Sequence, residues 1–269
     1  MKHKIKILFR SSLAEEYEKL SIVKYFNIIE SRSLAQKGDL IIGRYSTLPY
    51  YDELEKDIKI IGAELINSFR QHRYIADMSS WYLDFEDITP KTWFRVEEVP
   101  ENQAGSFILK GETNSKKHLW KTHMFAKNKE EITSLYLRLL DDSLVSTQNI
   151  YVRQFEPMIK YGDGLNGLPI SKEFRFFIFD KQVVASGFYW SDQIDLFDGQ
   201  LPNPTEVPKT FLDDVINRVG NNSRFYVVDI GQKINGDWMV VELNCGTMSG
   251  LSCVNPDELY GNLKNILVK

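Results

Sequence analysis

Apolar runs and amphipathic runs alternate along the N-terminal third of the chain. Residues 4–9 and 39–43 are apolar enough to predict two strands. Residues 13–29 and 52–66 carry apolar side chains at helical spacing among strong helix formers, which predicts two helices. The order strand, helix, strand, helix is typical of a small parallel α/β unit.

The pattern changes after residues 87–93, where Thr89 and Pro90 predict either a helix start or a tight turn. Beyond this break, strands are predicted at 106–111, 149–157, 172–190 (two strands about an Asp-Lys turn) and 225–246 (a hairpin), and helices at 127–142, 210–220 and 255–268. A glycine-rich loop covers residues 162–169. Hairpins with segregated helices predict an α+β domain with an antiparallel sheet. We therefore expect an α/β domain of residues 1–88 followed by an α+β domain of residues 89–269.

The hairpin of residues 225–246, FYVVDIGQKINGDWMVVELNCG, places an acid in each strand. Asn235-Gly236 predicts a type I′ turn, which needs positive φ at both residues. If these two residues form the whole loop, Asp229 lies directly opposite Glu242, with their Cβ atoms roughly 4.5–5.5 Å apart. Asn244 follows two residues later and therefore lies on the same face of the sheet.

Two like charges that face each other destabilise a sheet unless something compensates them. Mg²⁺ does so directly, because it binds carboxylate oxygens, amide oxygens and the phosphate oxygens of nucleotides. The alternative is that both acids point to solvent and pair with lysines. The apolar neighbours of both acids favour the first interpretation, in which Asp229, Glu242 and Asn244 form a metal site.

Composition and charge narrow the function classes. The chain has 269 residues, of which 43% are hydrophobic, and a formal net charge of −4. That charge argues against a surface that neutralises nucleic-acid phosphates. The N-terminus has no apolar signal-peptide segment and no run is long enough to span a membrane, so we expect a cytoplasmic protein. Cys245 and Cys253 are interpreted as reduced thiols, because their spacing is not a zinc pattern.

An Asp in one strand followed by Glu-x-Asn in the next resembles the metal-binding strands of the ATP-grasp superfamily. The resemblance implies an α+β fold in which two subdomains grip ATP, preceded by a small α/β domain. It also implies that ATP and Mg²⁺ activate a carboxylate as an acyl phosphate, which then reacts with an amine. A small-molecule or peptide acceptor follows from the same resemblance.

Further segments resemble this superfamily in the expected order. FILKG implies that Lys110 binds the phosphates, and KEFRFFIFD implies that Glu173 lies near the ribose and Arg175 on phosphate or acceptor. In YVRQFEP, the backbone groups around three residues would contact adenine: Arg153, Phe155 and Glu156. Arg153 stands where many relatives carry an acid.

The loop ETNSKKHLWK lacks the glycines usual in the phosphate-covering loop of this superfamily. The second nucleotide lysine is therefore Lys116, Lys117 or Lys121, of which we prefer Lys121 because it follows Trp120 directly. Residues 112–120 are either a lid that hinges at Gly111 or a surface loop without a gating role.

Two arginines are candidates on chemical grounds alone. Arg175 lies in a strand rich in phenylalanine, so its guanidinium needs an anionic partner or a stacking face. Its alternative role is a structural pair with Glu173. Arg44 and Ser46 follow a short buried strand and are candidates for binding the acceptor carboxylate. Rival functions for the whole chain are an ATP-dependent kinase, a catalytically silent ATP-binding module, and a structural protein that binds no nucleotide.

Overall fold

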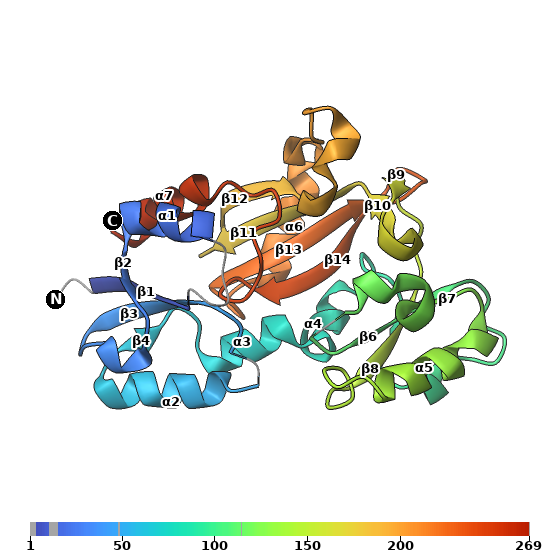
Figure 1. The fold of residues 1–269 in the computed structure, drawn as a ribbon, viewed down its shortest axis with the longest axis horizontal. Coiled ribbons are helices and arrows are strands. Elements are labelled where there is room, and N and C mark those ends of the chain that lie inside the picture. The colour runs from blue at the N-terminus through green and yellow to red at the C-terminus, as the bar shows by residue number, and fades with distance from the viewer. Residues whose placement is uncertain (1–3, 11–15, 48, 114, 269) are drawn as a thin grey trace.

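The computed structural model describes residues 4–10, 16–47, 49–113 and 115–268. Among them, three four-stranded sheets and one two-stranded hairpin form the framework. Figure 1 shows the N-terminal sheet at one end, a large C-terminal sheet in the middle, and a smaller sheet with α5 at the other end. None of the described helices combines the length and apolar character needed to cross a membrane.

The N-terminal sheet is parallel throughout, as the sequence predicts. Its strands, in spatial order, are β2 (Asn27–Ile29), β1 (Lys4–Phe9), β3 (Asp39–Arg44) and β4 (Glu64–Leu65). Helices α1 (Glu16–Tyr25) and α2 (Tyr51–Ile61) connect them.

Both predicted helices of this unit are too long at their C-terminal ends. Residues 27–29 pair in parallel with β1, because Ile28 and Ile29 complete the edge of the sheet. Gly62 ends α2 with φ of 80°, a left-handed conformation that glycine adopts without steric cost, and β4 follows. Residues 13–15 of the first predicted helix lie outside the described residues.

The smaller sheet, which we call the α5 sheet after the helix that covers it, is antiparallel. Its strands, in spatial order, are β5 (Thr92–Trp93), β8 (Ile150–Gln154), β6 (Phe107–Gly111) and β7 (Phe125–Ala126). Helix α5 (Ile132–Leu140) covers one face through Ile132, Leu135 and Leu139. The boundary between domains at residues 88 and 89 stays a prediction.

The C-terminal sheet is also antiparallel. Its strands, in spatial order, are β12 (Gln182–Phe188), β11 (Glu173–Phe179), β13 (Phe225–Gln232) and β14 (Trp238–Cys245). One face packs on three helices, which are α3 (Phe69–Ala76), α4 (Met78–Phe85) and α6 (Lys209–Val219). The predicted Asp-Lys turn is confirmed, since Asp180 and Lys181 both have positive φ, and Gly220 ends α6 as expected.

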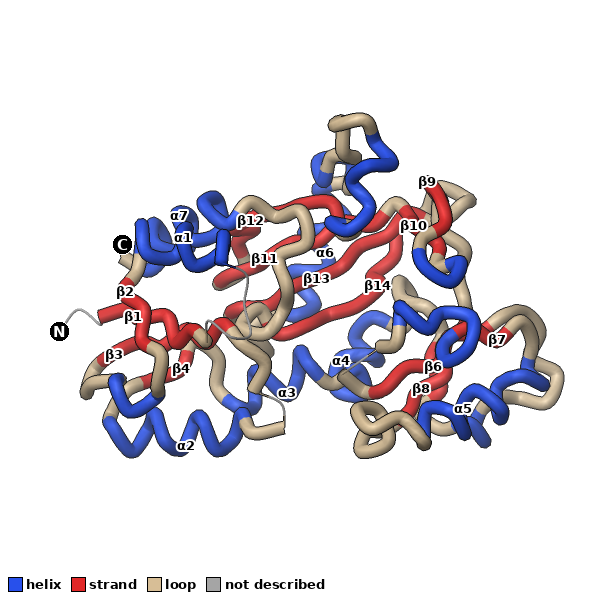
Figure 2. The backbone as a smooth tube through the Cα atoms, in the orientation of Figure 1, coloured by secondary structure: helices blue, strands red, loops and turns tan. Residues whose placement is uncertain are grey.

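The other face of this sheet changes character along its length. At one end, Phe177 and Val227 pack against β1, α1 and the C-terminal helix α7 (Pro256–Leu267), which Asn255 caps as predicted. At the other end, the same face carries Glu173, Arg175 and Asp229, since side chains alternate between faces along a strand. A small hairpin of β9 (Lys160–Asp163) and β10 (Pro169–Ser171) borders this charged end, and Figure 2 shows it beside the ends of β13 and β14.

The loop between β13 and β14 differs from the prediction. Of Asn235 and Gly236, only Gly236 has positive φ, at 94°. Lys233 donates to the Asp237 carbonyl at 2.8 Å and accepts from the Gly236 amide at 2.9 Å, which makes a three-residue loop. A bulge in β14 at Val241 offsets the extra loop residue, so Asp229 still pairs with Glu242. The predicted pairing of Asp229 with Glu242 is confirmed, but between the bulge and the turn the register differs from the prediction by one residue, and the predicted turn is wrong.

Candidate active site

Asp229 and Glu242 lie side by side on the face of the C-terminal sheet that meets the α5 sheet. Asp229 is fully buried, and its two carboxylate oxygens accept hydrogen bonds from Nε and Nη2 of Arg175, each at 2.8 Å. Nη1 of Arg175 donates to the Gly250 carbonyl at 2.7 Å, and the guanidinium lies 4.7 Å from the Tyr189 ring centre. Every part of this guanidinium therefore has a partner.

The proposed alternative partner of Arg175, Glu173, is wrong, because the bidentate partner is Asp229 on the adjacent strand. Burial by itself would lower the pKa of Arg175, but the carboxylate of Asp229 raises it above its ordinary value. The pair is thus held in its ionised form.

Glu242 contacts a lysine from the other sheet. Nζ of Lys110, at the end of β6, donates to Oε1 of Glu242, although the two residues are 132 positions apart in sequence. Burial alone would raise the pKa of Glu242, but the charges of Lys110, Lys117 and Arg153 lower it to about 2. The Glu242 carboxylate therefore stays ionised at any physiological pH.

A cleft between the two sheets is lined by Lys110, Lys117 and Glu242, among others. Glu173 lines it too and is almost completely buried. Its Oε1 has no hydrogen-bond partner among the described residues. Burial raises its pKa to about 7, and the like charges of Asp229 and Glu242 act in the same direction while Lys117 opposes them. An orphaned buried carboxylate oxygen in a cleft is a group suited to accept hydrogen bonds from a ligand.

The structure separates the three candidate lysines. Lys117 lines the cleft, where its Nζ donates to the Tyr189 hydroxyl at 2.6 Å and lies 4.1 Å from that ring centre. Lys116 instead pairs with Asp142 at 2.8 Å. Lys121 lines a different cavity, beside Gly167, so the structure does not bring it to Lys110 and Glu242.

The segment predicted to bind adenine crosses the back of the cleft. Phe155 and Glu156 line it, together with Ile108 and Met239. Arg153 also lines the cleft, but its guanidinium is already engaged: it donates to the Val241 carbonyl at 2.7 Å and to the hydroxyls of Thr89 and Thr92. Because the Val241 carbonyl is that of the bulged residue, Arg153 also helps to hold the bulge that sets the register of Glu242.

A family model described as "ATP-grasp domain, R2K clade family 3" matches residues 99–263, which is more than half of the chain. The chain belongs to the ATP-grasp superfamily. No curated protein matches the sequence. The ATP-grasp fold expected from the sequence resemblance is confirmed by the family match and by the fold of solved structures.

Three ATP-grasp structures illustrate the similarity of fold. D-cycloserine synthetase DcsG has a TM-score of 0.63 at 10% identity, covering 98% of this chain and 99% of its own. D-alanine–D-alanine ligase from Bacillus anthracis, solved with ATP, has a TM-score of 0.60 at 10% identity, covering 98% and 95%. The ligase PsnB, solved with a minimal precursor, has a TM-score of 0.59 at 12% identity, covering 99% of each chain.

The three predicted metal ligands of this ATP-grasp chain share one face. Asn244 pairs with Val227 across the hairpin, two residues from Glu242 and half-buried. Two carboxylates and one amide oxygen are a donor set that fits Mg²⁺ rather than a softer metal. Among the described residues, no group of three or more His, Cys, Asp and Glu side chains is arranged to hold a metal ion, so the predicted site includes the amide oxygen of Asn244.

Arg44 does not serve as a free acceptor-binding residue. It is buried, its Nε donates to Glu18 and to the Tyr260 hydroxyl, and its Nη1 donates to the Gly246 carbonyl at 2.6 Å. These contacts join β3 to α1, α7 and the loop after β14. Ser46 is exposed nearby. Tyr189, which contacts both Arg175 and Lys117, escaped the sequence analysis because a tyrosine in an aromatic run carries no distinguishing pattern.

Proposed function

We propose that this ATP-grasp protein is a ligase that uses ATP and Mg²⁺ to activate a carboxylate as an acyl phosphate and join it to an amine. One observation carries the proposal: Glu242 lines one cleft with the cations Lys110 and Lys117, and it pairs across the hairpin with Asp229, which Arg175 holds beneath the cleft surface. Oxygen ligands for a metal beside donors for phosphate are what magnesium triphosphate requires. ATP in the B. anthracis relative, and Mg with ADP in PsnB, support the choice of nucleotide and metal.

In this proposal the residues exchange partners when nucleotide binds. Lys110 and Lys117 leave Glu242 and Tyr189 and donate to phosphate oxygens. Glu242, with Asp229 and Asn244, would then hold Mg²⁺, which would neutralise phosphate charge. Arg175 keeps Asp229 oriented, as its bidentate contact does already. In this proposal the phosphates lie between the two sheets.

The nucleoside end of the cleft is assigned to different residues. Backbone groups around Phe155 and Glu156 contact adenine in this proposal, and the unpartnered Oε1 of Glu173 accepts from the ribose hydroxyls. The side chain of Arg153 takes no part in adenine binding, because its donors hold Thr89, Thr92 and the Val241 carbonyl. It acts as a positioning residue for β14.

The reaction is a two-step exchange on the acceptor carboxylate. A carboxylate oxygen attacks the γ-phosphorus, and the bond to the β-phosphate oxygen breaks to release ADP. The amine nitrogen then attacks the acyl carbon, loses a proton, and displaces phosphate that carries the former carboxylate oxygen. The protein contributes mainly alignment and charge stabilisation. The acceptor is an amino acid, another small molecule or a peptide.

Oxygen-isotope transfer tests this proposal. ¹⁸O-labelled amino acids and short peptides would be supplied as acceptors with ATP and Mg²⁺, and the released phosphate analysed by mass spectrometry. A ligase is expected to transfer one ¹⁸O per turnover to phosphate. A kinase would phosphorylate an acceptor without labelled phosphate, and a silent ATP-binding module would consume no ATP with any acceptor; either result would contradict the ligase assignment.

Lys117 and Lys121 are expected to differ in their effect on nucleotide binding. Lys117→Met should weaken binding of a non-hydrolysable ATP analogue with Mg²⁺ about tenfold or more, because one charged phosphate donor is lost. Lys121→Met removes the same charge from the other cavity and should change the affinity less than about twofold. Isothermal titration calorimetry distinguishes the two. The reverse order would restore Lys121 as the nucleotide lysine.

A further inference from the structure

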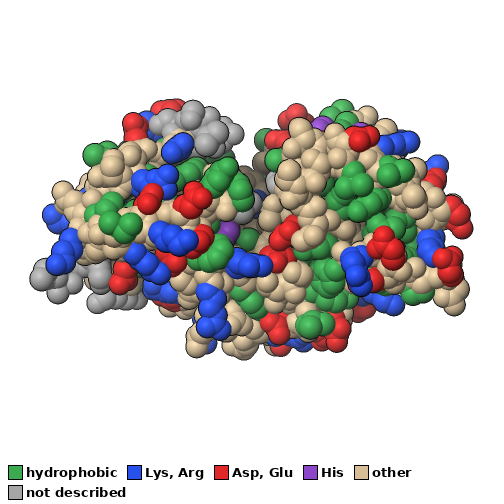
Figure 3. Space-filling model, turned by 90° about the horizontal axis from the view of Figure 1, so that it is seen from below, with side chains coloured by type: hydrophobic (Ala, Val, Ile, Leu, Met, Phe, Trp, Pro, Cys, Tyr) green, Lys and Arg blue, Asp and Glu red, His purple; other side chains and the backbone are tan. Residues whose placement is uncertain are grey.

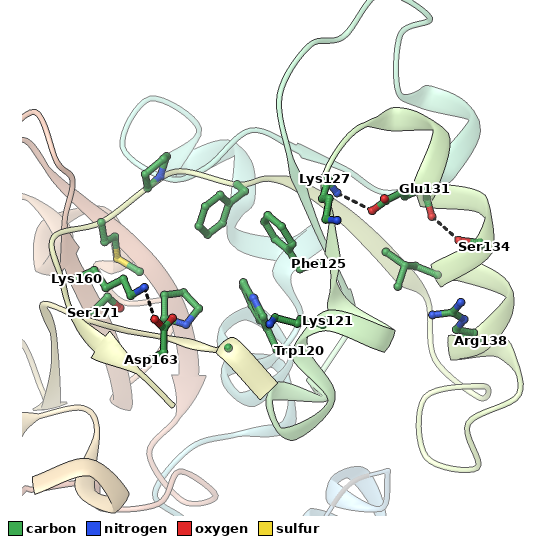
Figure 4. Close-up of a pocket in the computed structure, with 16 residues that line it drawn as sticks. Trp120, Lys121, Phe125, Lys127, Glu131, Ser134, Arg138, Lys160, Asp163 and Ser171 are labelled. Carbon is green, nitrogen blue, oxygen red and sulfur yellow. Dashed lines mark hydrogen bonds and ion pairs between the residues drawn. The ribbon is translucent and has the colours of Figure 1, made fainter. Parts of the chain in front are cut away.

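A second cavity, which we call the outer cavity, lies beyond the nucleotide cleft. It has a volume of about 760 Å³, within the range of small-molecule sites. Its walls come from the π-helical turn Trp120–Met124, β7, α5, the linker after β8 and the hairpin β9–β10 (Figure 4). It adjoins the cleft described above, since Trp120, Phe155, Met158 and Pro169 line both, but none of the cleft residues Lys110, Lys117, Glu173 and Glu242 lines it.

Three aromatic rings divide the two spaces. Trp120 and Phe125 are stacked, with ring centres 5.4 Å apart and planes at 18°, and Phe155 packs edge-on against both. Trp120 and Phe155 line both spaces, whereas Phe125 lines the outer cavity alone. The outer cavity thus has an aromatic wall suited to a planar or apolar group.

The charged side chains around this wall are mostly cations. Four cations line the outer cavity against two carboxylates: Lys121, Lys127, Arg138 and Lys160, with Glu131 and Asp163. Lys160 is neutralised by Asp163 at 2.7 Å, and Glu131 accepts from the backbone amide of Lys127 at 2.9 Å. Among the described residues, no carboxylate forms an ion pair with Lys121, Lys127 or Arg138.

The backbone supports the position of Lys121. Gly167, in the glycine-rich loop that the proposed function does not use, has φ of 73°. This left-handed conformation favours glycine, and Lys121 packs over it: a Cβ at this position would lie 2.5 Å from Cε of Lys121, so the end of the lysine would have to move. Asn166 donates to the His118 carbonyl at 2.6 Å and ties the loop to the segment before Trp120. In Figure 4, Lys121 lies between the aromatic wall and α5, which carries Arg138.

We infer that the outer cavity is a second binding site, for a small organic anion that carries an aromatic or apolar group. The ring wall takes the apolar part, and Lys121, Lys127 and Arg138 take the carboxylate, sulfonate or phosphate. Three cations without carboxylate partners beside stacked aromatic rings, in a chain with net charge −4, favour an anion over a neutral ligand. The inference does not depend on the proposed ligase activity.

The probe for the test is 8-anilinonaphthalene-1-sulfonate, an aromatic sulfonate whose fluorescence increases on binding. Wild-type protein saturated with a non-hydrolysable ATP analogue and Mg²⁺ is expected to bind one probe per chain. Lys121→Met and Lys127→Met should each weaken binding about tenfold. Lys56→Met, an equal charge change on α2, should leave it unchanged. The affinity for the uncharged analogue N-phenyl-1-naphthylamine should fall less than about twofold in either cavity variant.

Several results would overturn the inference. The first is that the wild type fails to bind the probe stoichiometrically. The second is that the ATP analogue displaces the probe. The third is that the cavity variants lose affinity equally for the charged and the uncharged probe. Thermal unfolding of each variant checks that the fold is retained. Lys127 serves as the second variant because its side chain makes no hydrogen bond or ion pair among the described contacts, so its removal should not disturb folding. Failure of this binding test would leave the oxygen-isotope test of the ligase proposal unaffected.

Discussion

Glu242→Gln is expected to lower ATP-dependent turnover by about 10²- to 10³-fold. The substitution keeps the size and hydrogen-bonding capacity of the side chain but removes its charge. Glu242 is held ionised, with a pKa of about 2, because the cations around it outweigh the effect of burial. A neutral amide loses the electrostatic attraction to Mg²⁺ and leaves Lys110, Lys117 and Arg153 without the carboxylate that balances them.

Steady-state turnover with the best acceptor from the isotope experiment measures this effect. Glu258→Gln makes the same chemical change on the exposed surface of α7 and should keep full activity. Thermal unfolding of both variants separates loss of the site from loss of the fold. Turnover of Glu242→Gln within about threefold of wild type would mean that this carboxylate binds no catalytic metal.

Arg175→Met is expected to reduce the free energy of unfolding by about 3–5 kcal/mol. The substitution leaves Asp229 fully buried without its bidentate partner, and an uncompensated buried carboxylate is costly. Chemical denaturation measures the change. The double variant Arg175→Met/Asp229→Leu removes both charges and should recover much of the lost stability, because apolar Phe177 and Val227 lie along the same face. It should remain inactive, since it lacks a proposed metal ligand.

Arg224, directly before β13, and Asp180, directly after β11, provide a matched control at the end of the same sheet. They form the same two-point contact, at 2.9 and 2.8 Å, but both side chains are substantially exposed. Arg224→Met should therefore cost no more than about 1 kcal/mol. If Arg175→Met cost as little as this control, the buried pair would not be a determinant of stability. Full activity in the double variant would remove Asp229 from the proposed metal site.

The hairpin shows how much of the candidate site local sequence patterns can predict. Two apolar runs on either side of Asn235-Gly236 predicted both strands, and the pairing of Asp229 with Glu242 is confirmed. The predicted turn type was wrong because the loop includes Ile234 as well as Asn235 and Gly236. The bulge at Val241 compensates for this extra loop residue, so that Asp229 still pairs with Glu242. A bulge depends on contacts from elsewhere, here the Arg153 side chain on the Val241 carbonyl, so local sequence contains no signal for it.

The sequence by itself determined the parallel N-terminal unit, the antiparallel C-terminal sheet and the set of residue types that form the site. These follow from periodicity and from strand alternation, which act over a few residues. Only the tertiary structure decided the partners: Asp229 for Arg175, Glu242 for Lys110, and Lys117 rather than Lys121 in the cleft. The physical reason is that these contacts join strands and loops far apart in sequence. Which charges meet there depends on how the two sheets pack.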